Sequence, residues 1–417
     1  MDYFRYLDNR LHCEQVPLDQ IAQQVGTPFY CYSQATLERH FDVFNNAFGT
    51  SDHLICYSVK ANSALAILDL LARRGSGFDI VSGGELERVR RVGCPGNRVV
   101  FSGVGKTETE ILAALEQRIL MFNVESHSEL LRINTLAGRL GVQAPIALRI
   151  NPDVDPITHP YISTGLKRNK FGIPHTQAME IYALAASLDH VQPIGLDCHI
   201  GSQLTTLDPF VDALKRVKQL VIALRRAGIP LRYLDLGGGL GIPYDAHSIP
   251  PHPERYAEAL LQELDGLKIT LILEPGRVIV GNAGILVARV EYVKEGEEKR
   301  FIITDAGMND LIRPALYDAH HTILPVMRRF DREEILADVV GPICETGDFL
   351  ARDRMLPTFH SGELLAVRSA GAYGFSMSSN YNSRPRAAEV MVSQDRFAVI
   401  RPRETIHQLM EQETLFA

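Results

Sequence analysis

Short apolar runs alternate with helix-length amphipathic segments over the first two thirds of the chain, and this alternation limits the possible folds most strongly. The segments SALAILDLLARR, GGELERVRRVG, TETEILAALEQ and TQAMEIYALAASL repeat apolar residues with the period of a helix. Strands that alternate with helices form parallel sheets, because each crossover helix returns the chain to the same edge. The predicted strands are Leu54–Val59, Phe78–Val81, Arg98–Phe101, Leu120–Val124, Ile146–Ile150, Ile194–His199, Leu231–Leu236 and Leu271–Leu273.

These units match the size of a closed (β/α)8 barrel, and a doubly wound open sheet is the alternative. The pattern changes after about residue 283, where ILVARVEYVKEGEEKRFIITDAG indicates two strands around a charged turn. GELLAVRSAGAYG and AAEVMVSQDRFAVIRP continue with strand-like runs, and RETIHQLMEQE is typical of a helix. We therefore predict an α/β chain with a TIM-type barrel over residues 27–282 and a mostly antiparallel β domain over residues 1–26 plus 283–417.

Length and charge exclude several classes of protein. A chain of 417 residues, 46% of them apolar, can bury the cores of two domains. Its net charge of -7 argues against nucleic-acid binding, which usually needs a basic surface. No apolar run is long enough to span a bilayer, and the polar N-terminal segment MDYFRYLDNRLHCEQ has no signal-peptide pattern. The cysteines form no CxxC pair, so we expect reduced thiols, no metal site and a cytoplasmic location.

Polar residues and glycines follow the predicted strands at the end where barrels of this kind place their active sites. Lys60 follows the first strand, and Asp79 lies in the second. His199 ends the sixth strand, and Glu274 follows the eighth. The strands were assigned from apolar runs alone, so this coincidence independently supports an active site at these strand ends.

The loops after strands seven and eight favour phosphate binding. The run GGGLG, residues 237–241, lets backbone N–H groups approach an anion without interference from side chains. The motif EPGR, residues 274–277, occupies the neighbouring loop, and these two loops often form the phosphate site of a barrel. For the glycine run alone, a tight strand-to-helix turn without a ligand is the alternative.

Lys60 is the candidate nucleophile. In a low-dielectric site its amine loses its proton more readily and can form a Schiff base with an aldehyde, whereas a surface lysine at a strand end is the alternative. Glu274 enters the same region as a carboxylate, or it forms a structural salt bridge with Arg277 three residues on. His199 can stack on a planar ring, or it can be a hydrogen-bonded structural residue.

Residues of the second domain can also carry chemistry. Cys344 in GPICETGD can donate a proton if partly exposed, and a small buried thiol is the alternative. Arg313 and Tyr317 in DLIRPALY lie one helical turn apart, so both can face a carboxylate. Tyr373 lies in GAYGFSMSSNYNSRPR, whose Gly, Ser and Asn residues predict either a binding loop or a solvated one.

Together these motifs make the chain resemble the fold-type III pyridoxal-phosphate-dependent decarboxylases. The resemblance implies pyridoxal 5'-phosphate as the cofactor and the decarboxylation of meso-2,6-diaminopimelate to L-lysine and CO2, the last step of lysine biosynthesis. It also implies a homodimer whose active sites are shared across the interface. The resemblance is carried by TPFYCYS, YSVKANSALAIL, GFDIVSGGEL, HPYISTGLKRNKFGI, HIGSQ, LDLGGGLGI, LEPGR, GPICETGD and YNSRPRAAEVMV.

The resemblance further implies roles for residues around the cofactor. Lys60 would form the Schiff base, His199 would stack on the ring, and Glu274 would hold the ring nitrogen. Asp79 would lie near the cofactor without a defined role. The phosphate would be surrounded by Ser202, Gly238, Gly239, Gly276 and Arg277.

For the substrate, the resemblance implies a second set of residues. Arg313 and Tyr317 would bind the distal carboxylate, and Glu345 would bind the distal ammonium. Arg277 would also reach the substrate, and Tyr373 would touch both the cofactor and the substrate. Cys344 would enter the partner subunit's site as the acid.

Three alternatives share part of this pattern. Decarboxylases of ornithine, arginine or carboxynorspermidine do not need a cation for a distal carboxylate, whereas Arg313 and Arg277 beside Glu345 suit diaminopimelate. Alanine racemase uses a similar barrel but resembles this chain less, because it places an arginine where this chain has Glu274. A cofactor-carrying regulatory protein would lack the second domain, and an inactive relative would be expected to lose Lys60 or Cys344. The sequence therefore favours catalysis.

Overall fold

The computed structural model of the protein describes residues 2–154, 170–245, 249–297 and 299–416. The contacts within the chain divide it into two compact units. The barrel unit comprises Phe41–Ile242 and Ile249–Val278, and the β unit comprises Met1–His40, Pro243–Ser248 and Ile279–Ala417. Most of the motif HPYISTGLKRNKFGI lies outside the described residues.

Parallel strands close into a barrel, so the predicted TIM-type barrel is confirmed and the open sheet is wrong. Each predicted apolar run forms one strand of the ring, and the pairings of β13 with β5 and of β8 with β9 close it. The short strand β10 (Ile173–Pro174) pairs in parallel with the last two residues of β9. The strands of the ring, in order, are β5 (His53–Ser58), β6 (Gly77–Ile80), β7 (Val99–Phe101), β8 (Met121–Val124), β9 (Ala144–Asn151), β11 (Val191–Asp197), β12 (Tyr233–Asp235) and β13 (Thr270–Leu273).

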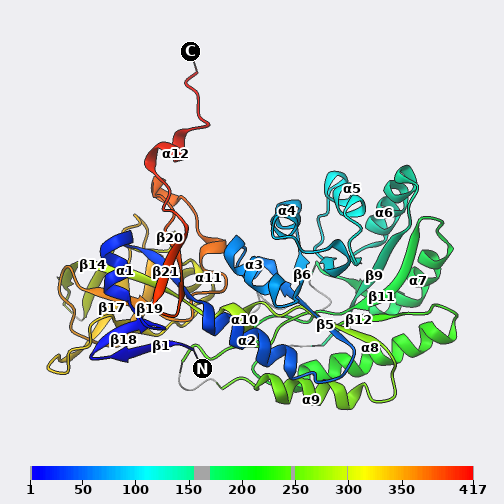
Figure 1. Ribbon diagram of the computed structural model, residues 1–417, viewed down its shortest axis with the longest axis horizontal. Coiled ribbons are helices and arrows are strands. Elements are labelled where there is room, and N and C mark those ends of the chain that lie inside the picture. Colours follow the sequence, from blue (N-terminus) through cyan, green and yellow to red (C-terminus); the bar gives the residue numbers. More distant parts are fainter. Residues whose placement is uncertain (1, 155–169, 246–248, 298, 417) are drawn as a thin grey trace. The chain divides into compact units, whose positions relative to one another are not determined.

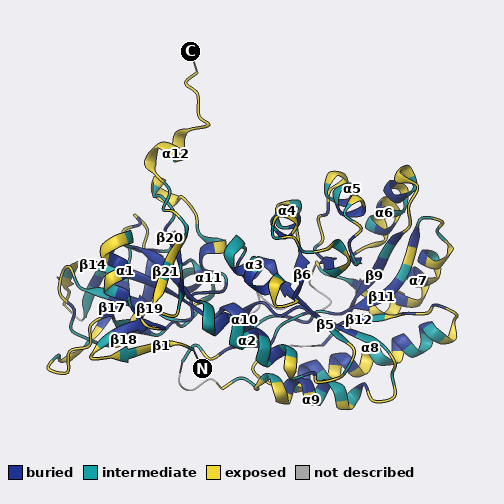
Figure 2. Ribbon diagram, viewed as in Figure 1, coloured by how far each residue is buried: buried dark blue, intermediate teal, exposed yellow. Residues whose placement is uncertain are grey.

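Helices connect these strands and lie outside them (Figure 1). Their apolar sides face the ring, which explains why the strands are buried almost throughout (Figure 2). Polar side chains begin several helices: Thr107 and Glu110 form a capping box on α5, and Ser126 accepts from the Glu129 N–H on α6. The helices are α3 (Leu65–Arg73), α4 (Gly83–Arg91), α5 (Glu108–Glu116), α6 (His127–Leu140), α7 (Ala178–Ser187), α8 (Asp208–Arg226) and α9 (Pro253–Glu263).

The β unit is built on a mostly antiparallel sheet, as predicted. The strand β14 (Gly284–Glu295) lies at its centre and pairs with three others, β4 (Phe29–Ser33), β15 (Arg300–Thr304) and β19 (Leu364–Val367). Only the pairs β4–β20 and β15–β17 are parallel among the described strands of this sheet. The others are β16 (Ile323–Pro325), β17 (Glu334–Val340), β18 (Phe349–Pro357), β20 (Ala388–Ser393) and β21 (Arg396–Arg401).

The strand β4 explains where the β unit begins and ends. All five of its residues are buried, and it pairs with β14 on one side and β20 on the other. The division by contacts falls after His40 and after Val278. Helices α2 (Gln34–Asn46) and α10 (Arg277–Val280) run through these two points. The boundaries at 27 and 282 stay a prediction.

Smaller elements complete the β unit. A three-stranded sheet precedes helix α1 (Leu18–Val25), and Leu18, Ile21 and Ala22 of that helix pack into the apolar core with Phe29. Toward the other end of the described chain, α12 (Ile406–Met410) is mostly exposed, and residues 411–416 are exposed (Figure 2). The remaining elements are β1 (Phe4–Leu7), β2 (Arg10–Cys13), β3 (Val16–Pro17) and α11 (Arg313–Tyr317).

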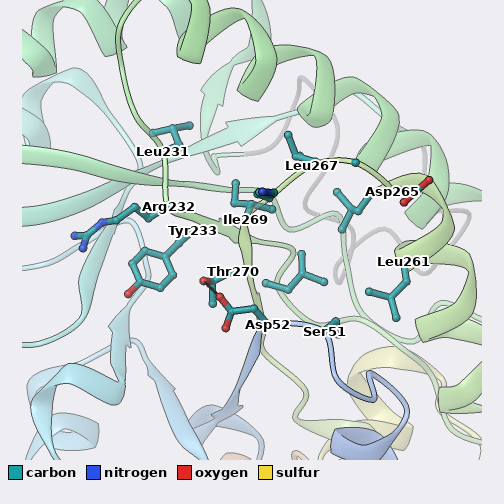
Figure 3. A pocket seen from close by; sticks show the side chains of 14 residues that line it. Ser51, Asp52, Leu231, Arg232, Tyr233, Leu261, Asp265, Leu267, Ile269 and Thr270 are labelled. Carbon is teal, nitrogen blue, oxygen red and sulfur yellow. Dashed lines mark hydrogen bonds between the residues drawn. The ribbon is translucent and has the colours of Figure 1, made fainter.

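The end of the barrel opposite the carboxyl ends of its strands contains a hollow of about 680 Å³ (Figure 3). Asp52, Tyr233 and Thr270 line it, at the starts of β5, β12 and β13. Thr270 Oγ1 donates to Asp52 Oδ2 at 2.5 Å, which ties two of these strand starts together. Among the described residues, no helix combines the length and the apolar character that crossing a bilayer requires.

Candidate active site

The polar residues predicted at the strand ends of the barrel unit gather at one end of the ring. Lys60 lies in the short turn η1 (Val59–Ala61) directly after β5, and Asp79 lies in β6. His199 follows β11, and Glu274 follows β13. Because the strands are parallel, their carboxyl ends meet at the barrel mouth, where such barrels place their chemistry.

An ion pair holds Lys60 at this mouth. Its Nζ donates to Oδ2 of Asp79 at 2.6 Å, and Ser58 Oγ donates to the same oxygen at 2.9 Å. The Lys60 side chain is 36% exposed, whereas that of Asp79 is fully buried. The second oxygen of Asp79, Oδ1, is buried with no hydrogen-bond partner among the described residues. Asp79 thus holds the partly exposed Lys60 side chain at the barrel mouth, where a ligand can reach it.

Glu85 adds a second acid near this pair. It lies in the first turn of α4, and its Oε2 accepts from the Val81 N–H at 2.8 Å. Burial raises the pKa of Glu85 to about 7, and the Asp79 carboxylate adds to this rise while the Lys60 charge opposes it. Glu85 therefore changes its protonation near neutral pH.

Glu274 is 5% exposed, so its carboxyl group is buried. Its backbone carbonyl oxygen accepts from Ser58 Oγ at 3.0 Å. Its Oε1 accepts from Ser102 Oγ at 3.3 Å and from Asn123 Nδ2 at 3.4 Å. Burial, followed by the charges of Asp235 and Asp79, raises the pKa of Glu274 well above its usual value. A cation beside this carboxyl group would therefore favour its ionised form strongly.

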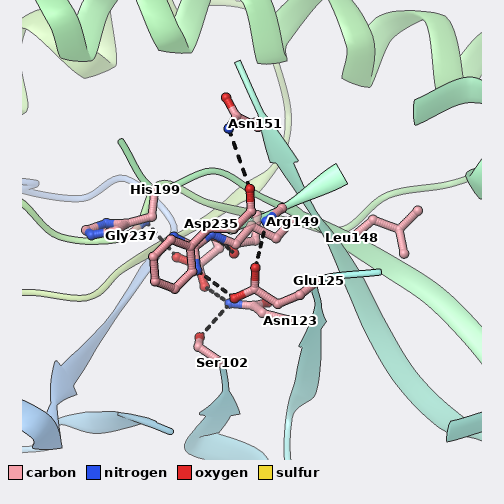
Figure 4. A network of polar contacts seen from close by, with 12 residues as sticks. Ser102, Asn123, Glu125, Leu148, Arg149, Asn151, His199, Asp235 and Gly237 are labelled. Carbon is pink, nitrogen blue, oxygen red and sulfur yellow. Dashed lines mark hydrogen bonds and ion pairs between the residues drawn. The ribbon is translucent and has the colours of Figure 1, made fainter. Parts of the chain in front are cut away.

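Asp235 lies at the end of β12, beside Glu274. Its Oδ1 accepts from the Gly237 N–H at 2.9 Å, and its Oδ2 accepts from Asn123 Nδ2 at 3.1 Å. Figure 4 shows Asn123 between Asp235 and Ser102. Burial, followed by the charge of Asp197, raises the pKa of Asp235 to about 7.

A buried guanidinium completes this polar network (Figure 4). Arg149 of β9 donates through Nη1 to Glu125 Oε1 at 2.7 Å, and its Nε lies 3.8 Å from Asp197 Oδ2. Burial raises the pKa of Asp197 well above its usual value, and the Arg149 charge opposes this rise. Arg149 thus supplies a fixed, buried positive charge within the ring of strands.

His199 is neutral in this setting. The Gly238 N–H donates to its Nδ1 at 3.1 Å, so the ring proton lies on Nε2. Burial, followed by the charges of Arg149 and Lys60, lowers the pKa of His199 well below its usual value. A neutral, half-buried imidazole held in one orientation suits stacking on a planar ring.

The turn after β12 provides the donors for an anion. Gly237 and Gly239 have positive φ angles of 63° and 117°. A Cβ atom on Gly238 would lie 2.2 Å from the Glu274 carbonyl oxygen, so only glycine allows this close approach to the end of β13. Nearby, Arg277 is 6% exposed and donates through Nη2 to Ser202 Oγ at 3.0 Å. Backbone amides, a guanidinium and a hydroxyl are the donor types that suit a phosphate group.

These groups fit pyridoxal phosphate. The glycine turn with Arg277 suits its phosphate, the amine of Lys60 suits its aldehyde, and Glu274 suits its cationic ring nitrogen. The raised pKa of Glu274 shows that its ionised form lacks a compensating cation, and one buried oxygen of Asp79 has no hydrogen-bond partner among the described residues. A bound cation would stabilise both carboxylates. Gly276 also requires glycine, because its Cβ would lie 2.9 Å from that of Ala61.

Arg313 is held rigidly within the β unit. It begins α11, is 4% exposed, and its Nη1 hydrogen-bonds to His321 Nε2 at 2.9 Å. His321 is itself fixed through Nδ1 to the Arg368 carbonyl oxygen at 2.8 Å, which makes Nε2 the acceptor. The Arg313 guanidinium also lies over the Tyr244 ring, 4.6 Å from its centre. Such a guanidinium is preorganised for a carboxylate.

Tyr317 and Tyr373 are both half-buried in the β unit. Tyr317 ends α11, one turn after Arg313, as the sequence predicts. Tyr373 has a positive φ of 56°, a backbone conformation that is strained for a tyrosine. Strain of this kind is usual where a side chain must be aimed at a ligand.

Cys344 and Glu345 lie in an exposed loop of the β unit. Asp348 holds this loop, because its Oδ2 accepts from the Ile343 N–H at 2.6 Å. The Cys344 N–H donates to Asn382 Oδ1 at 2.9 Å, and its thiol is free. Exposure rules out the alternative of a small buried thiol and leaves Sγ accessible for proton transfer.

Sequence patterns did not indicate several polar residues of the barrel mouth. Asn123, Arg149, Asp197 and Asp235 lie inside apolar strands and are at least nine-tenths buried. A polar residue within a fully apolar run is costly to bury unless it is paired, and that is the signal that could have identified them.

The family model for the pyridoxal-binding domain of pyridoxal-dependent decarboxylases matches residues 34–281 of this chain. The barrel and its mouth therefore belong to an enzyme of that class, which removes a carboxyl group with pyridoxal phosphate. The chain is 55% identical to diaminopimelate decarboxylase of Haemophilus influenzae, over 99% of this chain and 100% of the relative. The identity to that of Vibrio cholerae is 56%, over 100% and 99%. This chain belongs to the diaminopimelate decarboxylase family.

Solved structures agree with this placement. The diaminopimelate decarboxylase of Helicobacter pylori complexed with L-lysine is 44% identical, with a TM-score of 0.92 over 95% of this chain and 99% of that one. The enzyme of M. jannaschii in complex with L-lysine is 38% identical, with a TM-score of 0.95 over 99% and 98%. The match covers both units of the chain in each case.

Proposed function

We propose that this protein converts meso-2,6-diaminopimelate to L-lysine and CO2 with pyridoxal phosphate, as the last step of lysine biosynthesis. The observation that carries the proposal is the accessible amine of Lys60, fixed at 2.6 Å by the buried Asp79 at the barrel mouth. The full-length identity to diaminopimelate decarboxylases supports the substrate. All cysteines are free, which supports the proposed location in the reducing cytoplasm.

In this proposal the barrel unit holds the cofactor. Pyridoxal phosphate supplies an aldehyde that bonds to amines and a cationic ring that accepts the electrons left by CO2. Lys60 would hold the cofactor through its aldehyde carbon. Glu274 would lie at the ring nitrogen, and His199 would lie against the ring. Around the phosphate lie Ser202, Gly238, Gly239, Gly276 and Arg277.

The β unit supplies the substrate specificity. Arg313 and Tyr317 bind the distal carboxylate, and Glu345 binds the distal ammonium. Arg277 and Tyr373 also contact the substrate, and Tyr373 touches the cofactor as well. The fixed guanidinium of Arg313 supports a substrate with a second carboxylate, because such a group needs no reorganisation to bind.

The protein is proposed to act as a homodimer. The Cys344 thiol enters the partner subunit's site and gives its proton to the α carbon after CO2 has left. The exposure of Cys344 and Glu345 supports this role, because an acid for another subunit must lie on the surface of its own.

A substrate assay tests the reaction. The purified protein with pyridoxal phosphate should release CO2 and L-lysine from meso-diaminopimelate, and Lys60→Ala should lower turnover by at least about a hundredfold. Ornithine and arginine are compared in parallel. Faster turnover of either would contradict the proposed substrate but leave the reaction class intact.

Borohydride reduction tests the position of the cofactor. Peptide mapping of the reduced holoenzyme should find the pyridoxyl group on Lys60. Lys106 is the matched control, because it is a buried lysine of the same unit whose Nζ donates to Glu129 at 2.7 Å and to two carbonyl oxygens. Labelling of Lys106, or of no lysine, would overturn the assignment.

A further inference from the structure

Asn123 is a fully buried residue of β8 to which neither the sequence nor the proposed function gives a role. Its Nδ2 lies 3.1 Å from Asp235 Oδ2 and 3.1 Å from Ser102 Oγ (Figure 4). The same nitrogen lies 3.4 Å from Glu274 Oε1. An amide nitrogen carries two hydrogens, so it serves two of these oxygens at a time and stays within reach of the third. Asn123 therefore joins the acids of two neighbouring strands.

The carboxyl groups of Asp235 and Glu274 share one donor, because Asn123 Nδ2 lies 3.1 Å from Asp235 Oδ2 and 3.4 Å from Glu274 Oε1. Two ionised carboxylates around one buried amide repel each other, which favours a proton on one of the two. Both oxygens of Asp235 accept from N–H groups, those of Gly237 and Asn123, at 2.9 and 3.1 Å. Glu274 receives only longer contacts, at 3.3 and 3.4 Å. Asp235 is the better-stabilised anion, so the proton lies on Glu274.

Charged groups on the neighbouring strands act on this pair. Asp79 of β6 and Asp197 of β11 are acidic neighbours, and each raises the pKa of a member of the pair: Asp79 that of Glu274 and Asp197 that of Asp235. Lys60 and Arg149 are positive neighbours and favour one negative charge on the pair. These opposite influences together favour an Asp235–Glu274 pair that holds one proton and carries one negative charge.

We propose that Asn123 is a positioning residue that holds Asp235 and Glu274 as a carboxyl pair with one shared proton, which Glu274 gives to the ring nitrogen of the cofactor. The inference rests on the proposed place of Glu274 at that nitrogen. The O–H bond of Glu274 breaks, its electron pair stays on the carboxylate, and an N–H bond forms. The ring cation then faces two carboxylates, which Asn123 keeps in position.

Infrared difference spectroscopy tests the pair without measuring activity. At neutral pH the apoprotein should show the C=O stretch of a protonated carboxyl group, and addition of pyridoxal phosphate should remove it. Glu274→Gln should lack this band. Asp235→Asn should weaken it, because the like charge that favours the proton is gone.

Asn123→Leu tests the positioning role. Asp235 loses a donor, so the proton redistributes and the carboxyl band should shift in frequency. The dissociation constant of pyridoxal phosphate should rise at least about tenfold, as expected for the loss of a hydrogen bond to a charged group. Asn309→Leu is the matched control, because Asn309 is 2% exposed and its side chain has no hydrogen-bond partner among the described residues. It should leave the band unchanged.

Two outcomes would overturn the proposal: no carboxyl band in the apoprotein, or a band that Asp235→Asn and Asn123→Leu leave unchanged while circular dichroism confirms folding. The ¹⁵N resonance of labelled cofactor separates this failure from that of the proposed function. If Glu274→Gln leaves the ring-nitrogen shift at its wild-type value, Glu274 does not hold that nitrogen. If the shift changes but no band appears, only the carboxyl pair is wrong.

Discussion

Glu85 illustrates, at the scale of a single residue, how the barrel mouth links stability to pH. Its pKa is raised to about 7 by burial, whereas in the unfolded chain it would be near 4.5. A carboxyl group with a raised pKa binds its proton more tightly in the folded state. Its contribution to stability is therefore fully present below pH 4.5 and is lost as the pH rises through about 7.

Glu85→Gln should remove this dependence. The free energy of unfolding of the wild type, relative to the variant, should fall by roughly 3 kcal/mol between pH 4.5 and pH 8. Urea unfolding of the two proteins at several pH values measures the difference. An equal pH slope in both proteins would contradict the raised pKa.

Glu110 provides a control of opposite sign. Hydrogen bonds from the Thr107 and Gly83 N–H groups lower the pKa of Glu110 against the effect of burial. The contribution of Glu110 to the free energy of unfolding is therefore present above about pH 4.5 and is lost as the pH falls. Glu110→Gln should cost stability at pH 8 and much less at pH 3.

The sequence indicates residues of the site unequally. Lys60 and Glu274 could be predicted, because each lies just beyond an apolar run, where parallel strands end. Asn123 and Asp235 could not, because they lie inside such runs and their meaning depends on closure of the ring. Hydrogen bonds between residues more than a hundred positions apart leave no periodic pattern.

At the scale of elements, the turn after β12 tolerates substitution poorly. Gly238→Ala would bring a Cβ atom to 2.2 Å from the Glu274 carbonyl oxygen, so the backbone must move. We expect a loss of about 1–3 kcal/mol in stability and at least a tenfold weaker affinity for pyridoxal phosphate. Thermal unfolding and a cofactor titration measure the two effects.

Gly105→Ala is the matched control. A Cβ atom there meets no atom within 4 Å and the residue has no positive φ. Stability should stay the same or rise by up to about 1 kcal/mol, because the unfolded chain loses freedom. Equal losses in both variants would show that the close approach at Gly238 has no special importance.

The strands of the barrel could be predicted individually, because helices cover one face and the barrel core the other, so that each run is apolar throughout. Strand β4 could not be placed in the same way. FYCYS is as apolar as a barrel strand, and only its pairing with β14 and β20 assigns it to the other sheet. Local pattern identifies a strand, whereas distant pairing decides its sheet.

At the scale of the whole molecule, hybrid dimers test the shared active site. Lys60→Ala and Cys344→Ala chains, each inactive, are mixed and allowed to exchange subunits. Half of the dimers should then contain one intact site, and activity should return to about a quarter of the wild-type value. Decarboxylation of meso-diaminopimelate measures the recovery.

Mixing Lys60→Ala with Glu274→Ala is the control. Both residues belong to the barrel unit, so every site in that hybrid lacks one of them and no activity should return. Absence of recovery in the first mixture, despite exchange confirmed by mass spectrometry of tagged chains, would show that Cys344 acts within its own subunit.

The place of β4 also has a consequence for how the protein is made. A ribosome releases Phe29–Ser33 long before its parallel neighbour Ala388–Ser393, because the whole barrel unit lies between them in the sequence. The barrel unit, Phe41–Ile242 and Ile249–Val278, can fold first, since domains generally fold as units during synthesis. The apolar segment Phe29–Ser33 must then wait, without its final neighbour β20, until Ala388–Ser393 has left the exit tunnel.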